Sequence, residues 1–210
     1  MTRRSLSVSA EVADIVRPAW EAFEALRVVG ADPRLDEPLQ SAAVAMRTAV
    51  DRSDVITAVR AMYKRIGLDP TKTRPSSEAL LRRVRKGQEL PRINGLVDLV
   101  NWSSLETQLP FGLYDLDQVR GAMTLRLGLT DEAYQGIRKD VVHLEGRLTL
   151  VDDEGPFGNP TSDSARTMVT TATTRALVVV FVPVPLGPGA GDEAAALIRD
   201  RVHRFAVTSP

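Results

Sequence analysis

The spacing of apolar residues changes at Pro110, and this change limits the fold more than any other feature of the sequence. Before Pro110, apolar residues recur every three or four positions, which is typical of amphipathic helices. After it come short, β-branched or alternating stretches bounded by Gly, Pro or Asp, which are typical of strands. The spacing predicts helices over residues 19–29, 38–50, 53–67, 76–86 and 93–108, then one sheet built from strands near 122–128, 147–152 and 177–184, then a helix over 191–205.

This order of elements predicts an α+β fold. Ser53 and Asp192 are the residue types that cap helix N-termini, and they precede two of the predicted helices. With 210 residues and 43% apolar side chains, the chain can bury a core of its own. We expect residues 1–59 to form a mostly helical N-terminal extension packed on the body, residues 60–185 to form the body, and residues 186–210 to form a C-terminal helix.

Composition excludes several functions. Lysine plus arginine and aspartate plus glutamate each total 27, so an RNA partner must be held by a local basic patch. The chain has no cysteine and two histidines, His143 and His203, which rules out thiol nucleophiles and argues against the usual zinc sites. We therefore expect no metal and no cofactor. No stretch approaches about 18 uninterrupted apolar residues, so we expect a cytoplasmic protein, with a monomer favoured.

Three short polar residues follow one another at helical spacing in the predicted helix over 93–108. Asn94, Asp98 and Asn101 lie at positions i, i+4 and i+7, so they form one stripe beside an apolar stripe. Such groups either line a pocket or tie neighbouring backbone together, as Asn and Asp often do. The spacing alone favours neither alternative.

The densest positive stretch lies at residues 72–92, where seven basic residues stand against two glutamates. It is a candidate surface for phosphates. Alternatively, its cations stabilise the end of a helix through the helix dipole and form a solvated face. The candidate phosphate-binding residues are Arg74, Arg82, Arg83, Arg85 and Arg92.

The segment "DDEGPFGNPTSDSART" at residues 152–167 combines turn signals with small hydroxyls, one carboxylate and one guanidinium. These groups are suited to hydrogen-bonding a polar ligand, and Asp163 is suited to pairing with a cationic group. The alternative is that Asp163 and its hydroxyl neighbours only tie a turn together.

Several ordered motifs carry a family resemblance. "VDLVNWSSLETQLPFGLYD" at residues 97–115, and "LVDDEGPFGNP" followed by "VTTATTRALVVVF", resemble the B3/B4 editing domain of the bacterial phenylalanyl-tRNA synthetase beta subunit. "RPSSEALLRRV", "LPRINGLVDLVNWSSL", "LPFGLYDLD" and "PTSDSART" are similar to signatures of freestanding B3/B4 proteins. The resemblance covers roughly residues 60–182 and implies the B3/B4 editing-domain fold.

In the synthetase this domain hydrolyses tyrosine wrongly attached to the tRNA for phenylalanine, so the resemblance implies a related ester hydrolysis. By position, Asn101 falls on an asparagine of the editing pocket, and Pro160 with Thr161 on the turn that forms its wall. The chain departs from the family at Val100, Gly112 and Val180, where the pattern has threonine, histidine and the glutamate that recognises the tyrosine hydroxyl.

We therefore expect a trans-editing deacylase that hydrolyses the ester of a mischarged tRNA, with a substrate other than tyrosine, such as an arginine mimic of the canavanine type. A non-catalytic module that binds tRNA or an amino-acid-like ligand is the alternative. Asn101, Thr161, Ser162 and Asp163 are the expected catalytic residues. The expected substrate-binding residues are Asn94, Asp98, Gly112, Tyr114, Pro160, Ser164, Arg166 and Thr167.

Overall fold

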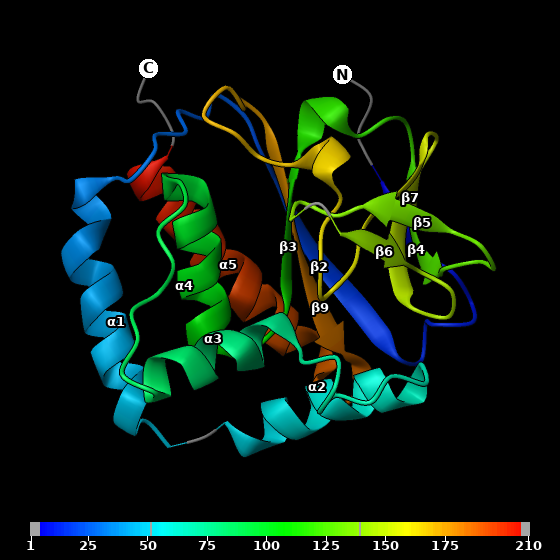
Figure 1. Ribbon diagram of the computed structural model, residues 1–210, viewed down its shortest axis with the longest axis horizontal. Coiled ribbons are helices and arrows are strands. Elements are labelled where there is room, and N and C mark those ends of the chain that lie inside the picture. The colour runs from blue at the N-terminus through cyan, green and yellow to red at the C-terminus, as the bar shows by residue number, and fades with distance from the viewer. Residues whose placement is uncertain (1–4, 51, 139, 207–210) are drawn as a thin grey trace.

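The computed structural model describes residues 5–50, 52–138 and 140–206, which combine helices with short strands (Figure 1). The five α-helices in this part of the chain are α1 (Asp36–Thr48), α2 (Ser53–Arg65), α3 (Ser76–Arg85), α4 (Gly95–Thr107) and α5 (Gly187–Phe205). The strands are β1 (Leu6–Val8), β2 (Val16–Phe23), β3 (Phe111–Asp115), β4 (Met123–Leu127), β5 (Ala133–Gln135), β6 (Val141–His143), β7 (Leu148–Asp152), β8 (Gly155–Gly158) and β9 (Ala176–Pro183). The predicted α+β fold is confirmed.

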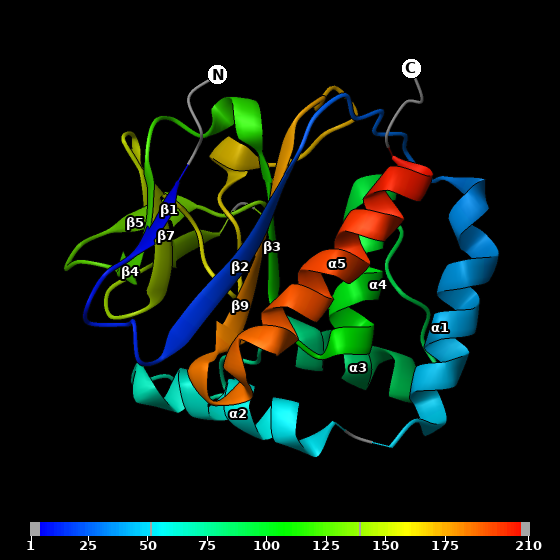
Figure 2. The same ribbon diagram turned by 180° about the vertical axis from the view of Figure 1, so that it is seen from behind.

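The antiparallel sheet β2-β9-β3 forms the centre of the molecule. All eight residues of β9 are buried, which explains why its sequence is a continuous apolar run rather than an alternating one. Helices α4 and α5 pack on one side of this sheet, and the second sheet lies on the other (Figures 1 and 2). Strand β3 pairs with β9 and contacts α4, and the cavity described below opens beside it.

The second sheet has the order β1-β4-β7-β8, and β5 pairs with β6 in a separate two-stranded ribbon. The ribbon is joined to the segment after β8 by an antiparallel bridge between Gly136 and Ser164. Strands near 122–128, 147–152 and 177–184 are confirmed as β4, β7 and β9. The prediction that these three strands share one sheet is wrong, because β9 pairs with β2 and β3 instead.

The predicted helix over residues 19–29 is also wrong, because Val16–Phe23 is strand β2. It pairs with β9 along its whole length, from Val16 opposite Pro183 to Phe23 opposite Ala176. A neighbouring strand of this length outweighs the modest helix propensity of the Ala and Glu residues in the segment. The N-terminal residues thus supply an edge strand to the central sheet. The domain boundaries expected at residues 59 and 185 stay predictions.

The two predicted caps are corrected as well. Ser53 is the first residue of α2 rather than its cap, and no side chain caps that helix. Helix α5 begins at Gly187, five residues before Asp192, with a proline in its first turn. Proline fits that position because its missing N–H would have no partner there. Within the described residues, no helix is long and apolar enough to cross a membrane.

Candidate functional site

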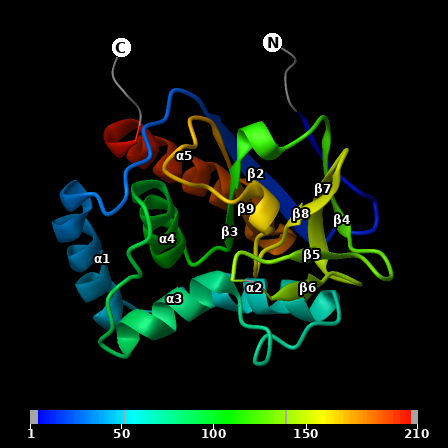
Figure 3. The same cartoon turned by 45° about the horizontal axis from the view of Figure 1, so that its top comes forward.

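A cavity of about 1020 Å³ opens between α3, α4, β3, the β5–β6 ribbon and the segment that follows β8. Figure 3 shows these elements converging around one region of the molecule. Apolar side chains from α4 and β3, including Val97, Val100, Phe111 and Leu113, form part of the lining. The rest is strongly polar, and its charges are unevenly distributed.

Five cationic side chains contribute to the lining, and four of them are exposed. This group, called the cationic rim below, consists of Arg74, Arg82, Arg83, Lys86 and Arg138. The acidic residues of the lining are Asp140, which is exposed, and Asp163. Because phosphate oxygens are attracted to clustered cations, the outer part of the cavity is suited to an anionic ligand.

Residues 159–163 contribute a continuous stretch of the lining, called the polar turn below. Helix α2 holds it from outside, since the Tyr63 hydroxyl lies 3.1 Å from the Pro160 carbonyl and 2.9 Å from Thr161 Oγ1. Ser76 at the start of α3 donates to the same carbonyl. Burial raises the pKa of Tyr63 to about 12, so its hydroxyl stays protonated at neutral pH.

The Asp163 carboxyl is buried within this wall. Its Oδ1 atom has no hydrogen-bond partner among the described residues. Burial raises the pKa of Asp163 to about 7, although the Tyr114 hydroxyl and the backbone amides of Leu113 and Asn159 act in the opposite direction. A carboxyl that titrates near neutral pH and lacks a full set of partners is typical of functional sites.

Tyr114 lies behind Asp163 and occupies space that two glycines leave open. Its ring is fully buried and meets the Phe157 ring edge-on. A Cβ atom on Gly112 would lie 2.0 Å from the Tyr114 hydroxyl, and one on Gly158 would lie 2.3 Å from it. Neither Gly112 nor Tyr114 lines the cavity. In this structure they support the wall beneath Asp163, and their expected substrate contact stays a prediction.

The polar stripe of α4 divides into two roles. Asn101 lines the cavity, and its side chain has no hydrogen-bond partner among the described residues. Asn94 caps α4 by accepting from the Val97 amide, and the fully buried Asp98 accepts from Arg92 at 2.8 Å and from the Ile93 amide at 2.9 Å. Asn94 and Asp98 thus have local structural roles here, and their expected substrate roles stay predictions.

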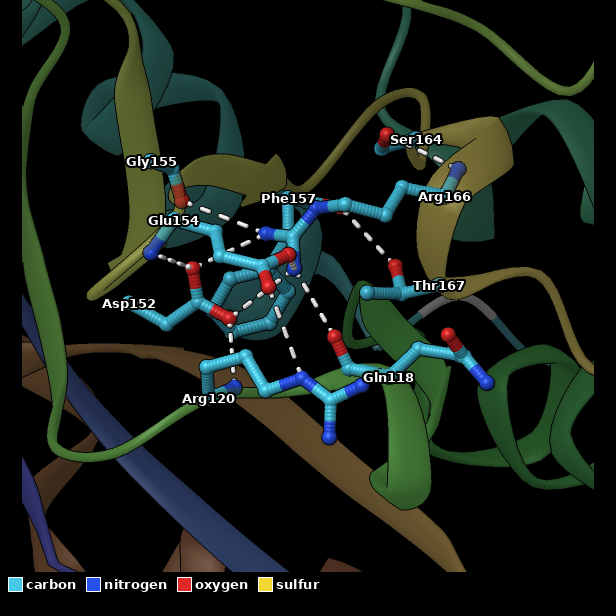
Figure 4. Close-up of polar contacts among 9 residues, drawn as sticks. All are labelled: Gln118, Arg120, Asp152, Glu154, Gly155, Phe157, Ser164, Arg166 and Thr167. Atoms are coloured by element: carbon cyan, nitrogen blue, oxygen red, sulfur yellow. Dashed lines mark hydrogen bonds and ion pairs between the residues drawn. The ribbon is translucent and has the colours of Figure 1, made fainter.

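Arg166 points away from the cavity into an acidic cluster (Figure 4). Its guanidinium pairs with Asp152 at 2.9 Å and Glu154 at 3.2 Å, over the Phe157 ring. The hydroxyls expected beside it are also occupied. Ser164 accepts from the Arg166 amide, and Thr167 donates to the Phe157 carbonyl. These three residues fix the end of the segment and do not line the cavity, and their expected substrate contact stays a prediction.

The basic candidates separate in the same way. Arg74, Arg82 and Arg83 belong to the cationic rim. Arg85, on the same helix, donates to the Ala49 carbonyl, and Arg92 is held by Asp98, Asp36 and the Asp32 carbonyl. Arg85 and Arg92 therefore do not line the cavity. The helical periodicity of α3 turns Arg85 toward α1, and Arg92 is engaged in ion pairs.

Five residues around the cavity were not expected from the sequence. Lys86 and Arg138 extend the rim, while Tyr63, Tyr134 and Asn159 hold the polar turn. Lys86 follows directly on the predicted basic residues of α3, so the sequence did contain a signal for it. Asn159 lies in the 152–167 segment, directly before the predicted Pro160 and Thr161, so the sequence pointed to its neighbourhood as well. Tyr63, Tyr134 and Arg138 come from distant segments, and no local pattern connects them. The described residues contain no group of three or more His, Cys, Asp or Glu side chains that could hold a metal ion.

Comparison with known proteins identifies the class of domain that this fold and cavity define. Residues 58–186 match the B3/4 domain model, and the chain belongs to that family. It is 31% identical over 62 residues to the phenylalanine–tRNA ligase beta subunit of Ralstonia nicotianae. That match covers 30% of this chain and 8% of the bacterial subunit.

A crystal structure of an N-terminal fragment of the phenylalanyl-tRNA synthetase beta-subunit from Pyrococcus horikoshii is also similar. Its TM-score is 0.52 at 14% sequence identity, and the match covers 99% of this chain and 51% of that one. At this identity the similarity shows the fold alone. The expected B3/B4 fold is confirmed, and the chain spans about half of the archaeal fragment.

The space around Tyr114 generates a first prediction. Gly112→Ala should lower the free energy of unfolding by roughly 1–3 kcal/mol, because its Cβ would force the buried Tyr114 ring to shift. Gly189→Ala in α5 is the control, since a Cβ there meets nothing within 4 Å. It should be neutral or slightly stabilising. Urea unfolding measures both, and equal stabilities of Gly112→Ala and wild type would contradict the tight fit.

The burial of the Asp163 carboxyl generates a second prediction. The unfolded carboxyl releases its proton near pH 3.8 and the folded one near pH 7, so the folded state binds more protons between these values. The free energy of unfolding of the wild type should therefore fall with rising pH, relative to that of Asp163→Asn, from about pH 4 to about pH 7. The difference should be constant above that range. Parallel curves for the two proteins would show that the carboxyl titrates normally.

Proposed function

We propose that this protein is an aminoacyl-tRNA deacylase that acts in trans: it binds a mischarged tRNA and hydrolyses the ester between the amino acid and the terminal ribose. The observation that carries the proposal is the single cavity that joins a cationic rim to a buried, incompletely paired carboxyl. The rim suits the phosphates of a tRNA acceptor end. The carboxyl suits a polar or cationic amino-acid side chain.

Asn101 and Ser162 are the groups best placed to handle the ester. Both line the cavity, and neither side chain has a hydrogen-bond partner among the described residues. The Thr161 hydroxyl, in contrast, is engaged by Tyr63, and the backbone amides of Thr161 and Ser162 already bind the Asn159 side chain. We therefore expect the side-chain amide of Asn101 and the hydroxyl of Ser162 to stabilise the oxyanion, and not the backbone amides of Thr161 and Ser162.

The reaction needs few catalytic groups because an aminoacyl ester is already activated toward hydrolysis. Water adds to the ester carbonyl, the bond between the carbonyl carbon and the ribose oxygen breaks, and a proton taken from the water ends on that ribose oxygen. Placing the water and the ester next to donors of fixed orientation supplies much of the acceleration. Asp163 has two candidate roles in this reaction. It binds and so recognises the side chain of the substrate, or it accepts a proton from the attacking water.

The two roles predict different behaviour of Asp163→Asn. If Asp163 pairs with a cationic side chain, kcat/KM for an arginine-like ester should fall roughly 10- to 150-fold, the equivalent of about 1.5–3 kcal/mol for a hydrogen bond to a charged group. Esters of tyrosine and alanine should change little. If Asp163 is the base, all three rates should fall together. Deacylation of tRNAs carrying each amino acid measures the pattern.

Asp140→Asn is the matched control, because it removes the same charge from the exposed part of the lining. It should change the three rates by less than about fivefold, as exposed charges interact weakly. A wild type that prefers the tyrosyl ester, or an Asp163→Asn variant that leaves the ranking unaltered, would remove Asp163 from substrate recognition.

A non-catalytic binding module is the second candidate, and a specific observation favours it. Gly112 and Val180 stand where the resemblance implies a histidine and a glutamate, and neither of them lines the cavity. Such a module would bind a tRNA that carries a cationic amino acid more tightly than one that carries a neutral amino acid. It would hydrolyse none of these esters. Binding without hydrolysis over the same panel would favour this function over the first.

The cationic rim generates a further prediction. Replacing Arg82 and Lys86 together by glutamine should weaken tRNA binding and reduce the slope of log affinity against log salt by about 1.5, because two fewer phosphate contacts release fewer counterions. The matched double variant replaces two exposed cations of α5, Arg199 and Arg204, which lie outside the cavity. An unchanged slope in the first variant, or an equal change in both, would mean that the rim does not contact phosphates.

A further inference from the structure

The polar turn is shaped from within by the side chain of Asn159. Its Oδ1 atom accepts two hydrogen bonds, from the backbone amides of Thr161 and Ser162, each at 2.8 Å. Asn159 is 3% exposed and lies in the cavity wall. These two hydrogen bonds to one buried oxygen fix the backbone of the turn at Thr161 and Ser162.

Tyr134 of the β5–β6 ribbon closes this arrangement into a ring of hydrogen bonds. Asn159 Nδ2 donates to the Tyr134 hydroxyl at 2.9 Å, and the hydroxyl donates to the Ser162 carbonyl at 2.5 Å. Burial raises the pKa of Tyr134 well above its ordinary value, so the phenol keeps the proton that the second bond requires. One asparagine and one tyrosine thus satisfy three backbone groups of the turn.

The ring connects two walls of the cavity. Asn159 precedes Asp163 in one wall, and Tyr134 belongs to the ribbon whose residues 136–138 form part of the other. The backbone amide of Asn159 also lowers the pKa of Asp163 and so lies close to its carboxyl. A shift of the ring would move the carboxyl and the Ser162 hydroxyl relative to the rest of the lining.

We propose that Asn159 and Tyr134 are positioning residues, which hold Asp163 and Ser162 in the geometry that the substrate meets. This inference rests on the proposed function, because it assumes that the cavity binds an aminoacyl ester. Tyr134 and Asn159 themselves do not act on the reacting atoms. Their removal should therefore change recognition by loosening the turn, with the groups that contact the ligand still present.

Tyr134→Phe tests the proposal, because it keeps the ring volume and removes one hydroxyl. Amide hydrogen exchange at Thr161 and Ser162 reports the state of the turn without any ligand and should become at least about tenfold faster. Affinity is measured with two non-hydrolysable 3′-aminoacylamino-adenosines, one with an arginine-like side chain and one with an alanine side chain. Binding of the first should weaken roughly 10- to 100-fold, and binding of the second much less.

Two further variants complete the test. Asn159→Ala removes both amide bonds and should reproduce the loss of selectivity if the variant folds. Thr107→Val is the control, since it also removes a buried hydroxyl that donates at 2.8 Å, in α4 and outside the cavity lining. It should lower stability without changing the ratio of the two affinities. A merely structural role of Tyr134 would give the same result as Thr107→Val.

Each outcome decides the proposal. Unchanged exchange in Tyr134→Phe would show that the ring does not hold the turn. Faster exchange with an unchanged affinity ratio would show that the turn does not set recognition. If the wild type binds the arginine-like analogue but hydrolyses no ester, the deacylase function fails and the affinity ratio still tests the positioning role. If it binds neither analogue, both proposals fail.

Discussion

The burial of β9 on both faces is the constraint on which the rest of the molecule depends. An apolar strand of eight buried residues needs a partner on each edge and a layer on each side. Strands β2 and β3 pair with its two edges, helices α4 and α5 cover one side of the sheet, and the second sheet covers the other (Figures 1 and 2). The pairing draws in two segments that are far apart in the chain, one near the N-terminus and one directly after α4. The position of β3 against α4, and with it one wall of the cavity, follows from this pairing.

The sequence predicted the elements whose signal is local. Strand β9 stands out as a continuous apolar run, and the helices α1 to α4 follow the spacing of their apolar residues. Strand β2 was missed because "AWEAFEALRVV" satisfies a helical pattern equally well, and only the distant β9 makes the extended form favourable. For the same reason the division of the strands into two sheets could not be predicted, since pairing depends on contacts that the spacing of residues does not encode.

The sequence likewise predicted some residues of the candidate site and missed others. The resemblance to the editing domain indicated Asn101 and the polar turn, and both line the cavity. Spacing correctly placed Asp98 in α4 and Asn94 at its start, but it could not distinguish a side chain that caps a helix from one that faces a ligand. The roles of Tyr134 and Asn159 depend on a ring of hydrogen bonds between a ribbon and a turn, which only the three-dimensional structure reveals.

The departures from the family pattern are physically connected. The residue at position 112 is a glycine, and the ring of Tyr114 fills the volume that a side chain there would need. Position 180 carries no acid, and its valine is buried between β2 and β3. The one buried acid of the lining instead comes from the polar turn, where Tyr114 lies beneath it. The Asp163 carboxyl lies on the polar turn and not on β9, so it would approach a ligand from the wall that residues 159–163 form. The carboxyl of the polar turn is therefore the physical reason to test cationic side chains before tyrosine, while the cationic rim is suited to the phosphates.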